Sequence, residues 1–346
     1  MSGFSKFFHA LHIMKEGAKS AFWGISLTLI LSLASLYIAT IPQVAQYHIS
    51  ALIIGILLGI VFSPLYASTR AQCEFGINFS AKRLLRLGIV LYGLRVSVDG
   101  LMSVGLHGVL ISVLVVVGIL VLGVFVGVKI LKMDKELALL ISSGSAICGA
   151  AAVLAVESAI KSAPHKSIIA LACVVLFGLV GMFAYPLVHS LSDLGLSESQ
   201  WGMYIGASLH EVANVVGAGS ALSDEGSAVA VIIKMIRVLL LIPVLLLIPL
   251  FFSSTDAGKS RKLHIPYFAF GFLAMVVLNS VISLPAQVVE FFNTLCVLCL
   301  SMAMSALGLQ IDFKKFANFG AQAFVLALIL FVALIIGGYV LVRVIA

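Results

Sequence analysis

Residues 142–152 read Ser-Ser-Gly-Ser-Ala-Ile-Cys-Gly-Ala-Ala-Ala, and they lie between strongly apolar segments. Small and weakly polar residues of this kind are poor material for a lipid-facing helix. The stretch therefore predicts an interrupted membrane helix whose backbone groups turn toward a ligand. Inside a bilayer such an interruption persists only where it is buried in protein or faces water.

A second stretch of the same character, Ser-Leu-His-Glu-Val-Ala-Asn-Val-Val-Gly, occupies residues 208–217. The first stretch offers hydroxyls and backbone N–H groups, whereas the titratable groups lie in the second stretch and in the helix after it. Neither stretch is a complete site alone. We therefore expect the two to meet in space.

The composition is that of an integral membrane protein. Of the 346 residues, 62% are hydrophobic and 10% are charged, whereas soluble domains are about 25% charged. We expect an all-α polytopic fold with a single membrane domain over residues 1–346 and room for about eleven spans of about 20 residues. The net charge of +7 is attributed to the positive-inside rule and not to nucleic acid.

The apolar runs define the expected spans. These are residues 21–40, 50–66, 80–98, 107–130, 136–160, 166–189, 200–222, 226–252, 266–283, 287–310 and 322–345, with a polar link at 67–78. The short segment 1–20 and the C-terminus are expected in the cytoplasm and the periplasm, respectively, because most basic loops then share one side. Lys161, His165 and Lys166 fall on the opposite side, so a re-entrant course of 136–160 or 200–222 stays open.

Two internal likenesses point to repeats. Residues 92–96 and 307–311 share a Gly-Leu pair that is followed by a glycine and an apolar helix, 215 residues apart. Their expected orientations are opposite, as in the inverted repeats of secondary transporters. The stretches at 142–152 and 208–217 are related by a weaker likeness at an offset of 63 residues. Their expected orientations are parallel, so one simple scheme does not contain both likenesses.

Ionisable residues inside membrane segments are costly and are candidates for function. His210 and Glu211 begin like the zinc motif H-E-x-x-H, but Asn214 stands where the second histidine belongs, so neither a metal site nor a cofactor is expected. His210 and Asn214 share a helix face and can donate to an anion, and histidine titrates near neutral pH. Glu211 could hold a coupling proton. Alternatively, His210 and Glu211 satisfy each other in a structural core.

Lys234 and Arg237 are three residues apart and share a helix face. They need a negative partner, for which Glu211, a lipid headgroup or an anionic substrate qualifies. Alternatively, they mark the cytoplasmic end of a span.

In the first stretch, Ser143, Ser145 and Cys148 can line a point toward which half-helix N-termini direct their partial positive charge. The alternative is a close helix–helix contact of the small-xxx-small kind, such as Ser145 with Gly149.

Several motifs resemble the YeiH-type family of bacterial inner-membrane proteins, whose members often have the label of sulfate exporter. They are Gly-Ser-Ala-Ile-Cys-Gly-Ala-Ala-Ala-Val at 144–153, His-Glu-Val-Ala-Asn-Val-Val at 210–216, Lys-Met-Ile-Arg-Val at 234–238, Arg-Leu-Gly-Ile-Val-Leu-Tyr-Gly-Leu-Arg at 86–95 and Met-Ala-Met-Ser-Ala-Leu-Gly-Leu at 302–309. The family is grouped with transporters similar to bile-acid/sodium symporters and cation/proton antiporters. The resemblance implies an inverted-repeat core with two interrupted helices that cross near the membrane midplane. No paired-acid sodium site accompanies it, so the coupling ion stays open.

The sequence therefore predicts a secondary transporter of a small anion, a sulfur oxyanion such as sulfate or sulfite, in the bacterial inner membrane. The family label implies export, whereas the residues leave the direction open. The alternatives are a sodium- or proton-coupled carrier of an organic anion, a channel and an intramembrane lipid-modifying enzyme. No catalytic residue is expected.

The expected partners are the anion, a proton or sodium ion and membrane lipids, and a homodimer is left open. The expected substrate-binding residues are Ser143, Ser145, Cys148, Ser208, His210, Asn214, Lys234 and Arg237, and the expected ion-coupling residues are His210, Glu211 and Glu157.

Overall fold

A computed structural model describes residues 2–45, 50–96, 98–192, 194–251, 267–282, 284–311 and 320–346. Every regular element in these ranges is helical, which confirms the predicted all-α class. The chain divides into two compact units. Unit 1 comprises Met1–Arg95 and Gly271–Asp312, and unit 2 comprises Val96–Phe270 and Phe313–Ala346.

Unit 1 is built around α3, which packs on α1 and α14. Its helices are α1 (Ser2–Thr40), α2 (Pro42–Ala45), α3 (Ala51–Phe79), the π-helical turn η1 (Ser80–Leu84), α4 (Leu85–Tyr92), the 3-10 turn η2 (Gly93–Arg95), most of α13 (Tyr267–Val281) and α14 (Ala286–Leu309). At Gly59 and Gly308 the backbones of α3 and α14 approach so closely that a Cβ on Gly308 would lie 2.2 Å from the carbonyl oxygen of Ile56. Such close approach through small residues is a common way for membrane helices to associate.

The predicted polar link at 67–78 is wrong. The chain is helical without a break over Ala51–Arg95, which is 45 residues. The polar residues of this region are accommodated on the helix, because Arg70 and Glu74 form an ion pair one turn apart at 3.0 Å and Thr69 donates its hydroxyl to the carbonyl of Leu65. A polar composition alone therefore did not end the helix.

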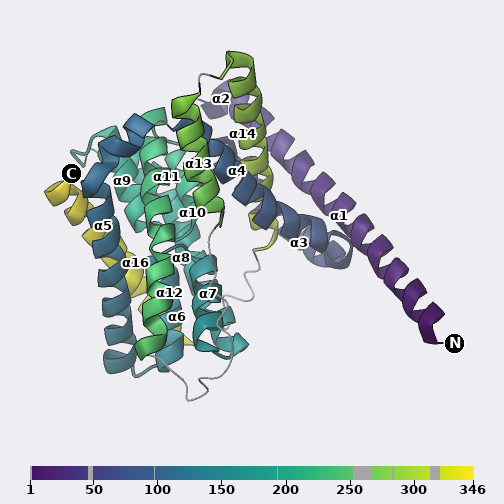
Figure 1. Ribbon diagram of the computed structural model, residues 1–346, viewed down its shortest axis with the longest axis horizontal. Helices are drawn as coiled ribbons and strands as arrows, with labels where there is room; N and C mark the ends of the chain where they lie inside the picture. The colour runs from purple at the N-terminus through teal and green to yellow at the C-terminus, as the bar shows by residue number, and fades with distance from the viewer. Residues whose placement is uncertain are drawn as a thin grey trace. The chain divides into compact units, whose positions relative to one another are not determined.

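Unit 2 contains the two stretches that were singled out in the sequence. Its helices are α5 (Val98–Phe125), the π-helical turn η3 (Val126–Ile130), α6 (Lys135–Ala146), α7 (Ala150–Ile160), α8 (Pro164–Leu191), α9 (Glu198–Ser208), α10 (Val212–Gly219), α11 (Asp224–Leu239), α12 (Leu241–Phe251) and α16 (Ala321–Ile345). Helix α11 packs on α5, α9 and α10, whereas α8 packs on α6, α7 and α10, and α16 packs on α5, α6, α8 and α9 (Figure 1). The short helices α6, α9 and α10 thus lie against long ones, whereas α7 contacts α6, α8 and α12.

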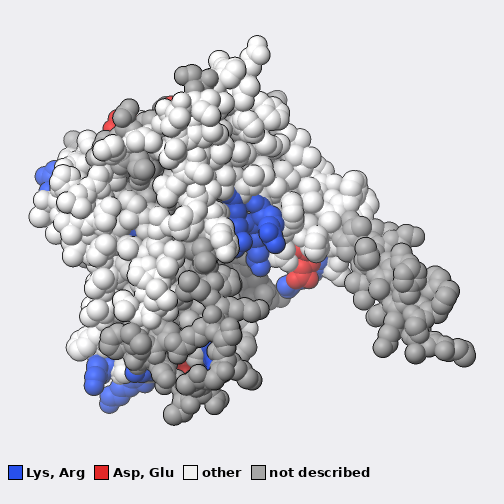
Figure 2. Space-filling view, in the orientation of Figure 1, with Lys and Arg blue, Asp and Glu red and all other residues white. Residues whose placement is uncertain are grey.

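Seven helices among the described residues are long and apolar enough to cross a membrane, and α7 and α13 are shorter apolar helices. Most of the described surface in Figure 2 carries no charge, and its Lys and Arg side chains gather in a few groups. The count of eleven spans, the inverted repeat and the orientation stay predictions. The basic residues Lys259, Arg261, Lys262, Lys314 and Lys315, on which the orientation depends in part, lie outside the described residues.

The contact between α3 and α14 leads to a stability prediction. Gly308→Ala places a methyl group against the Ile56 carbonyl, so we expect it to lower the free energy of unfolding by about 1–3 kcal/mol, as overpacking does. Gly337→Ala in α16 is the control, because a Cβ there meets nothing within 4 Å and alanine favours a helix by up to about 1 kcal/mol. Thermal unfolding of the purified variants measures both changes. Equal midpoints for the two variants would contradict the close contact.

Candidate functional site

The first interruption separates α6 from α7 at residues 147–149. Gly149 has a φ of +71°, a conformation that favours glycine. A Cβ at this position would also lie 2.2 Å from Cγ of Glu211. Both the backbone conformation and the space therefore require glycine here. Residues 138–146, Ile147 and Cys148 are all buried, so the break is enclosed in protein, which is one of the two ways in which a break inside a membrane can persist.

The second interruption separates α9 from α10 at residues 209–211. Leu209 and Glu211 are extended, with ψ values of 150° and 151°, and the flanking residues 201–208 and 212–219 are all buried. The predicted interruptions at residues 142–152 and 208–217 are therefore present.

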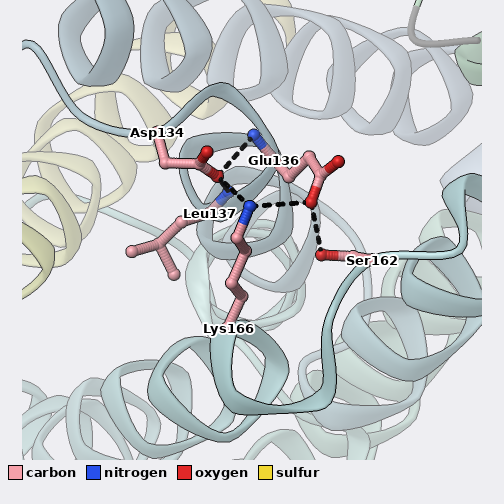
Figure 3. Close-up of polar contacts among 5 residues, drawn as sticks. All are labelled: Asp134, Glu136, Leu137, Ser162 and Lys166. Carbon is pink, nitrogen blue, oxygen red and sulfur yellow. Dashed lines mark hydrogen bonds and ion pairs between the residues drawn. The ribbon is translucent and has the colours of Figure 1, made fainter. Parts of the chain in front are cut away.

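The first interrupted segment is a helical hairpin, which we call hairpin 1 (residues 135–160), and it returns to the end at which it begins. Lys166, in the first turn of α8, lies 2.8 Å from Asp134 Oδ1 and 2.8 Å from Glu136 Oε2. Ser162, which follows α7, donates to the same Glu136 oxygen at 2.9 Å (Figure 3). The start of α6 and the end of α7 are therefore neighbours, so this segment does not run straight through unit 2.

The second interrupted segment is hairpin 2 (residues 198–219), and it also returns to its starting end. Glu198, the first residue of α9, accepts a hydrogen bond from the backbone N–H of Ser223, which follows α10, at 2.8 Å. The same carboxylate lies 2.9 Å from His189 Nε2 near the end of α8. Both interrupted segments thus have the re-entrant course that the loop charges left open.

Helix α8 shows that the two hairpins enter unit 2 from opposite ends. It spans 28 residues, which is about 42 Å. The base of hairpin 1 lies at Lys166 and that of hairpin 2 at His189. The tip of hairpin 2 contacts the middle of α8, since a Cβ at Gly178 would lie 2.3 Å from Nδ2 of Asn214. The expected parallel course of the two stretches is therefore wrong, because it assumed that residues 136–160 cross the membrane.

Lys234 and Arg237 of α11 join the two tips, and both are 0% exposed. The Lys234 ammonium donates to the carbonyl oxygens of Ile147 at 2.8 Å and Leu209 at 2.7 Å. The Arg237 guanidinium donates to five carbonyls of the same two breaks, at distances of 2.7–3.0 Å. They are those of Ser145, Ala146, Gly206, Ala207 and Leu209.

These carbonyls belong to the C-terminal ends of α6 and α9, where the helices leave their acceptors unpaired and have a partial negative charge. The cations therefore satisfy the acceptors that the interruptions expose. The partners expected for Lys234 and Arg237 were Glu211, a lipid headgroup or a substrate. The structure shows instead that both side chains donate to backbone carbonyls. Within the described residues no ion pair of 4.0 Å or less joins Lys234 to Glu211.

Glu211 connects the tips a second time. Its Oε1 accepts a hydrogen bond of 3.2 Å from the backbone N–H of Ala150, the first residue of α7. A carboxylate at this place is favoured, because the N-terminal end of a helix has a partial positive charge. The two stretches 142–152 and 208–217 therefore meet, as expected from the sequence.

The other predicted residues divide into two groups. Ser145 Oγ and both ring nitrogens of His210 are buried and have no hydrogen-bond partner in the described part of the chain. The His210 ring packs against Phe331, with 5.9 Å between the ring centroids, and Cys148 is a buried free thiol near the break. These groups, together with Asn214, lie at the hairpin tips.

The second group is engaged in helix contacts or lies elsewhere. Ser143 donates to the carbonyl of Leu140, and Ser208 donates to the carbonyl of Tyr204 and accepts a hydrogen bond from Tyr185. Glu157 lies seven residues beyond the start of α7, about 10 Å along the helix. The structure does not bring Glu157 to the tips.

Asp134 secures the base of hairpin 1. Its carboxylate caps α6 by accepting from the backbone N–H groups of Glu136 and Leu137, and it pairs with Lys166. Partial burial alone would raise the pKa of Asp134, but the hydrogen bonds from Lys166 and from these N–H groups outweigh it. The pKa of this carboxyl is therefore lower than usual. The stability that it contributes is present above its unfolded pKa of about 3.9 and is lost as the pH falls through the folded value.

The hydrogen bonds from Arg237 to the two tips lead to a stability prediction. Arg237→Gln leaves several buried carbonyls unpaired, each at a cost of about 1–3 kcal/mol, so we expect the free energy of unfolding to fall by about 3 kcal/mol or more. Arg343→Gln is the matched control, because Arg343 also donates to a backbone carbonyl, that of Gly195, but is exposed. Thermal unfolding in detergent measures the difference. If Arg237→Gln loses no more stability than Arg343→Gln, Arg237 does not hold the two breaks together.

The base of hairpin 1 leads to a pH prediction. Asp134→Asn keeps a capping side chain and removes the charge, so we expect it to cost about 0.5–1 kcal/mol at pH 7, as partly exposed pairs do. The difference from the wild type should shrink as the pH falls below about 4. The same substitution in a Lys166→Met background should cost less. Unfolding midpoints at pH 7 and pH 3 provide the test, and a pH-independent difference would contradict it.

The chain matches the family described as Conserved hypothetical protein 698 over residues 23–327. A UPF0324 membrane protein of Helicobacter hepaticus is 47% identical over 338 residues, which cover 92% of this chain and 96% of that protein. UPF0324 membrane proteins of Campylobacter jejuni and Pseudomonas putida are both 44% identical, over 93% and 91% of this chain and 94% and 91% of theirs. No solved structure matches. The chain therefore belongs to the UPF0324 family of membrane proteins, which confirms the resemblance to the YeiH-type family that its motifs indicated.

Proposed function

We propose that this protein is a secondary transporter that moves a small inorganic anion, a sulfur oxyanion such as sulfate or sulfite, across the bacterial inner membrane by alternating access. The observation on which the proposal rests is the meeting of two opposed hairpins at their tips, where Glu211 contacts Ala150 and Lys234 binds both breaks. Interrupted helices that meet inside a membrane protein are the usual substrate and ion sites of secondary transporters.

The charges at the tips favour an anion. Two cationic side chains and the N-terminal ends of α7 and α10 lie at the tips, where Glu211 is the carboxylate among the predicted residues. The side chain of Glu211 does not cap α10, so the first N–H groups of that helix are available to a ligand. Lys234 uses two of its three N–H groups on carbonyls in the described part of the chain, and the third is left for a ligand.

Two further donors at the tips support a polar ligand. The hydroxyl of Ser145 and the ring of His210 are buried without a partner among the described residues. A buried polar group that forms no hydrogen bond costs about 1–3 kcal/mol. An oxyanion that accepts from these groups would remove this cost, which a purely structural role for them leaves in place.

Glu211 supplies a means of coupling the anion to a proton. Its carboxylate accepts a hydrogen bond from the N–H of Ala150 at 3.2 Å, at the place that an anion would take at the N-terminal end of α7. Protonation of Glu211 removes its charge and weakens its hold on this helix end. The proton and the anion therefore bind together and travel in the same direction.

A binding screen tests this function. We expect sulfate or sulfite to raise the unfolding temperature of the purified protein relative to chloride at equal ionic strength, and to raise it more at pH 5 than at pH 8. Organic anions in the same panel test the alternative of an organic-anion carrier. If no anion stabilises the protein at either pH, the proposed function is wrong.

Matched variants assign the response to the tips. Glu211→Gln should bind the stabilising anion equally at pH 5 and pH 8, and His210→Ala should weaken binding about tenfold, the equivalent of one lost hydrogen bond to a charged ligand at about 1.5 kcal/mol. Glu225→Gln and His107→Ala, which change exposed residues, should behave like the wild type. Uptake of labelled sulfate into proteoliposomes with an imposed pH gradient then distinguishes transport from binding.

A further inference from the structure

The two hairpin tips present helix C-terminal ends to a single region of the protein interior. Carbonyl oxygens from both tips, including those of Ile147 and Leu209, converge there. In secondary transporters such carbonyls and half-helix C-terminal ends coordinate the coupling Na⁺ or proton. A membrane interior offers no water that could satisfy these carbonyls in place of a cation. The electrostatic demand for a cation at this point is therefore built into the fold.

Two side chains of the protein meet this demand. Arg237 has five N–H groups, and its three nitrogen atoms all donate to carbonyls of the breaks. The Lys234 ammonium bridges one carbonyl of each tip at 2.7–2.8 Å. Both side chains are fully buried, so the donors at the breaks are part of the chain and do not exchange with ions of the solvent.

A metal ion that bound at these carbonyls would lie close to the positive charges of Lys234 and Arg237. Two unit charges about 4 Å apart repel each other by about 4 kcal/mol at an effective dielectric constant of 20. The carbonyls that could offset this repulsion already accept hydrogen bonds from Lys234 and Arg237. A sodium ion at these carbonyls would therefore lack both free acceptors and a favourable potential.

We propose that Lys234 and Arg237 permanently take the place of a coupling cation, so that this transporter binds no Na⁺ at the hairpin tips. The inference rests on the proposed carrier function, and it adds that Na⁺ is excluded from the carbonyls of the two breaks. It also identifies the space around Lys234 Nζ as a latent site for a monovalent cation, which an ammonium group fits because it donates hydrogen bonds to carbonyls. This site becomes available when the lysine side chain is removed.

The test compares unfolding midpoints of the purified full-length protein in choline, sodium, potassium and ethylammonium chloride at equal ionic strength. The wild type should show the same midpoint, within about 1 °C, in choline and in sodium. Lys234→Ala should unfold at a lower temperature and regain several degrees in ethylammonium or in sodium. Tetramethylammonium, which has no N–H group, should give no recovery.

The control is Lys129→Ala, which removes an exposed lysine and should respond to no cation. Saturable stabilisation of the wild type by sodium would overturn the proposal, and so would a Lys234→Ala protein that no ammonium ion restores. If Lys234→Ala yields no folded protein, the comparison of the wild-type midpoints in choline and in sodium decides the test by itself. Because this test involves no transported anion, a failed anion screen and a failed cation test are distinct results.

Discussion

The hydrogen bonds from Lys234 and Arg237 to the backbone carbonyls of the two breaks are the interaction on which unit 2 depends. A helix that stops inside a membrane protein exposes carbonyl groups with no water to receive them. Here four helix ends meet, and the two that have partial negative charge are held by side chains from one neighbouring helix, α11. Without these cations, the interruptions would leave unpaired acceptors in a buried region.

The surrounding helices place this interaction at the centre of unit 2. Helix α8 connects the base of hairpin 1, at Lys166, with that of hairpin 2, at His189, and contacts the tips between them. The hairpins therefore approach each other from opposite ends. Glycines allow the close contacts at the tips, most clearly at Gly149, where the backbone conformation and the Glu211 side chain both exclude a Cβ.

The candidate site follows from this geometry. Lys234 and Arg237 direct their charge toward carbonyls of the tips, whereas Ser145 and His210 have donors without a partner in the described part of the chain. Glu211 combines a titratable carboxyl group with a direct contact between the two hairpins. Lys234, Arg237 and Glu211 thus hold the two tips together, and the groups proposed to bind an anion and a proton are Ser145, His210, the third N–H of Lys234 and Glu211.

Residue types alone predicted the helical class, the interruptions at 142–152 and 208–217 and the buried ionisable residues, because small residues, glycines and charges are unsuited to lipid. Sequence did not predict that residues 67–78 stay helical, since the ion pair of Arg70 and Glu74 is an effect of helix geometry. Nor could it show the hairpin course, because α6 and α7 have the same apolar pattern whether they cross or return. Only the tertiary structure decided that backbone carbonyls are the partners of Lys234 and Arg237, since every residue has such an acceptor and only folding determines which ones are left unpaired.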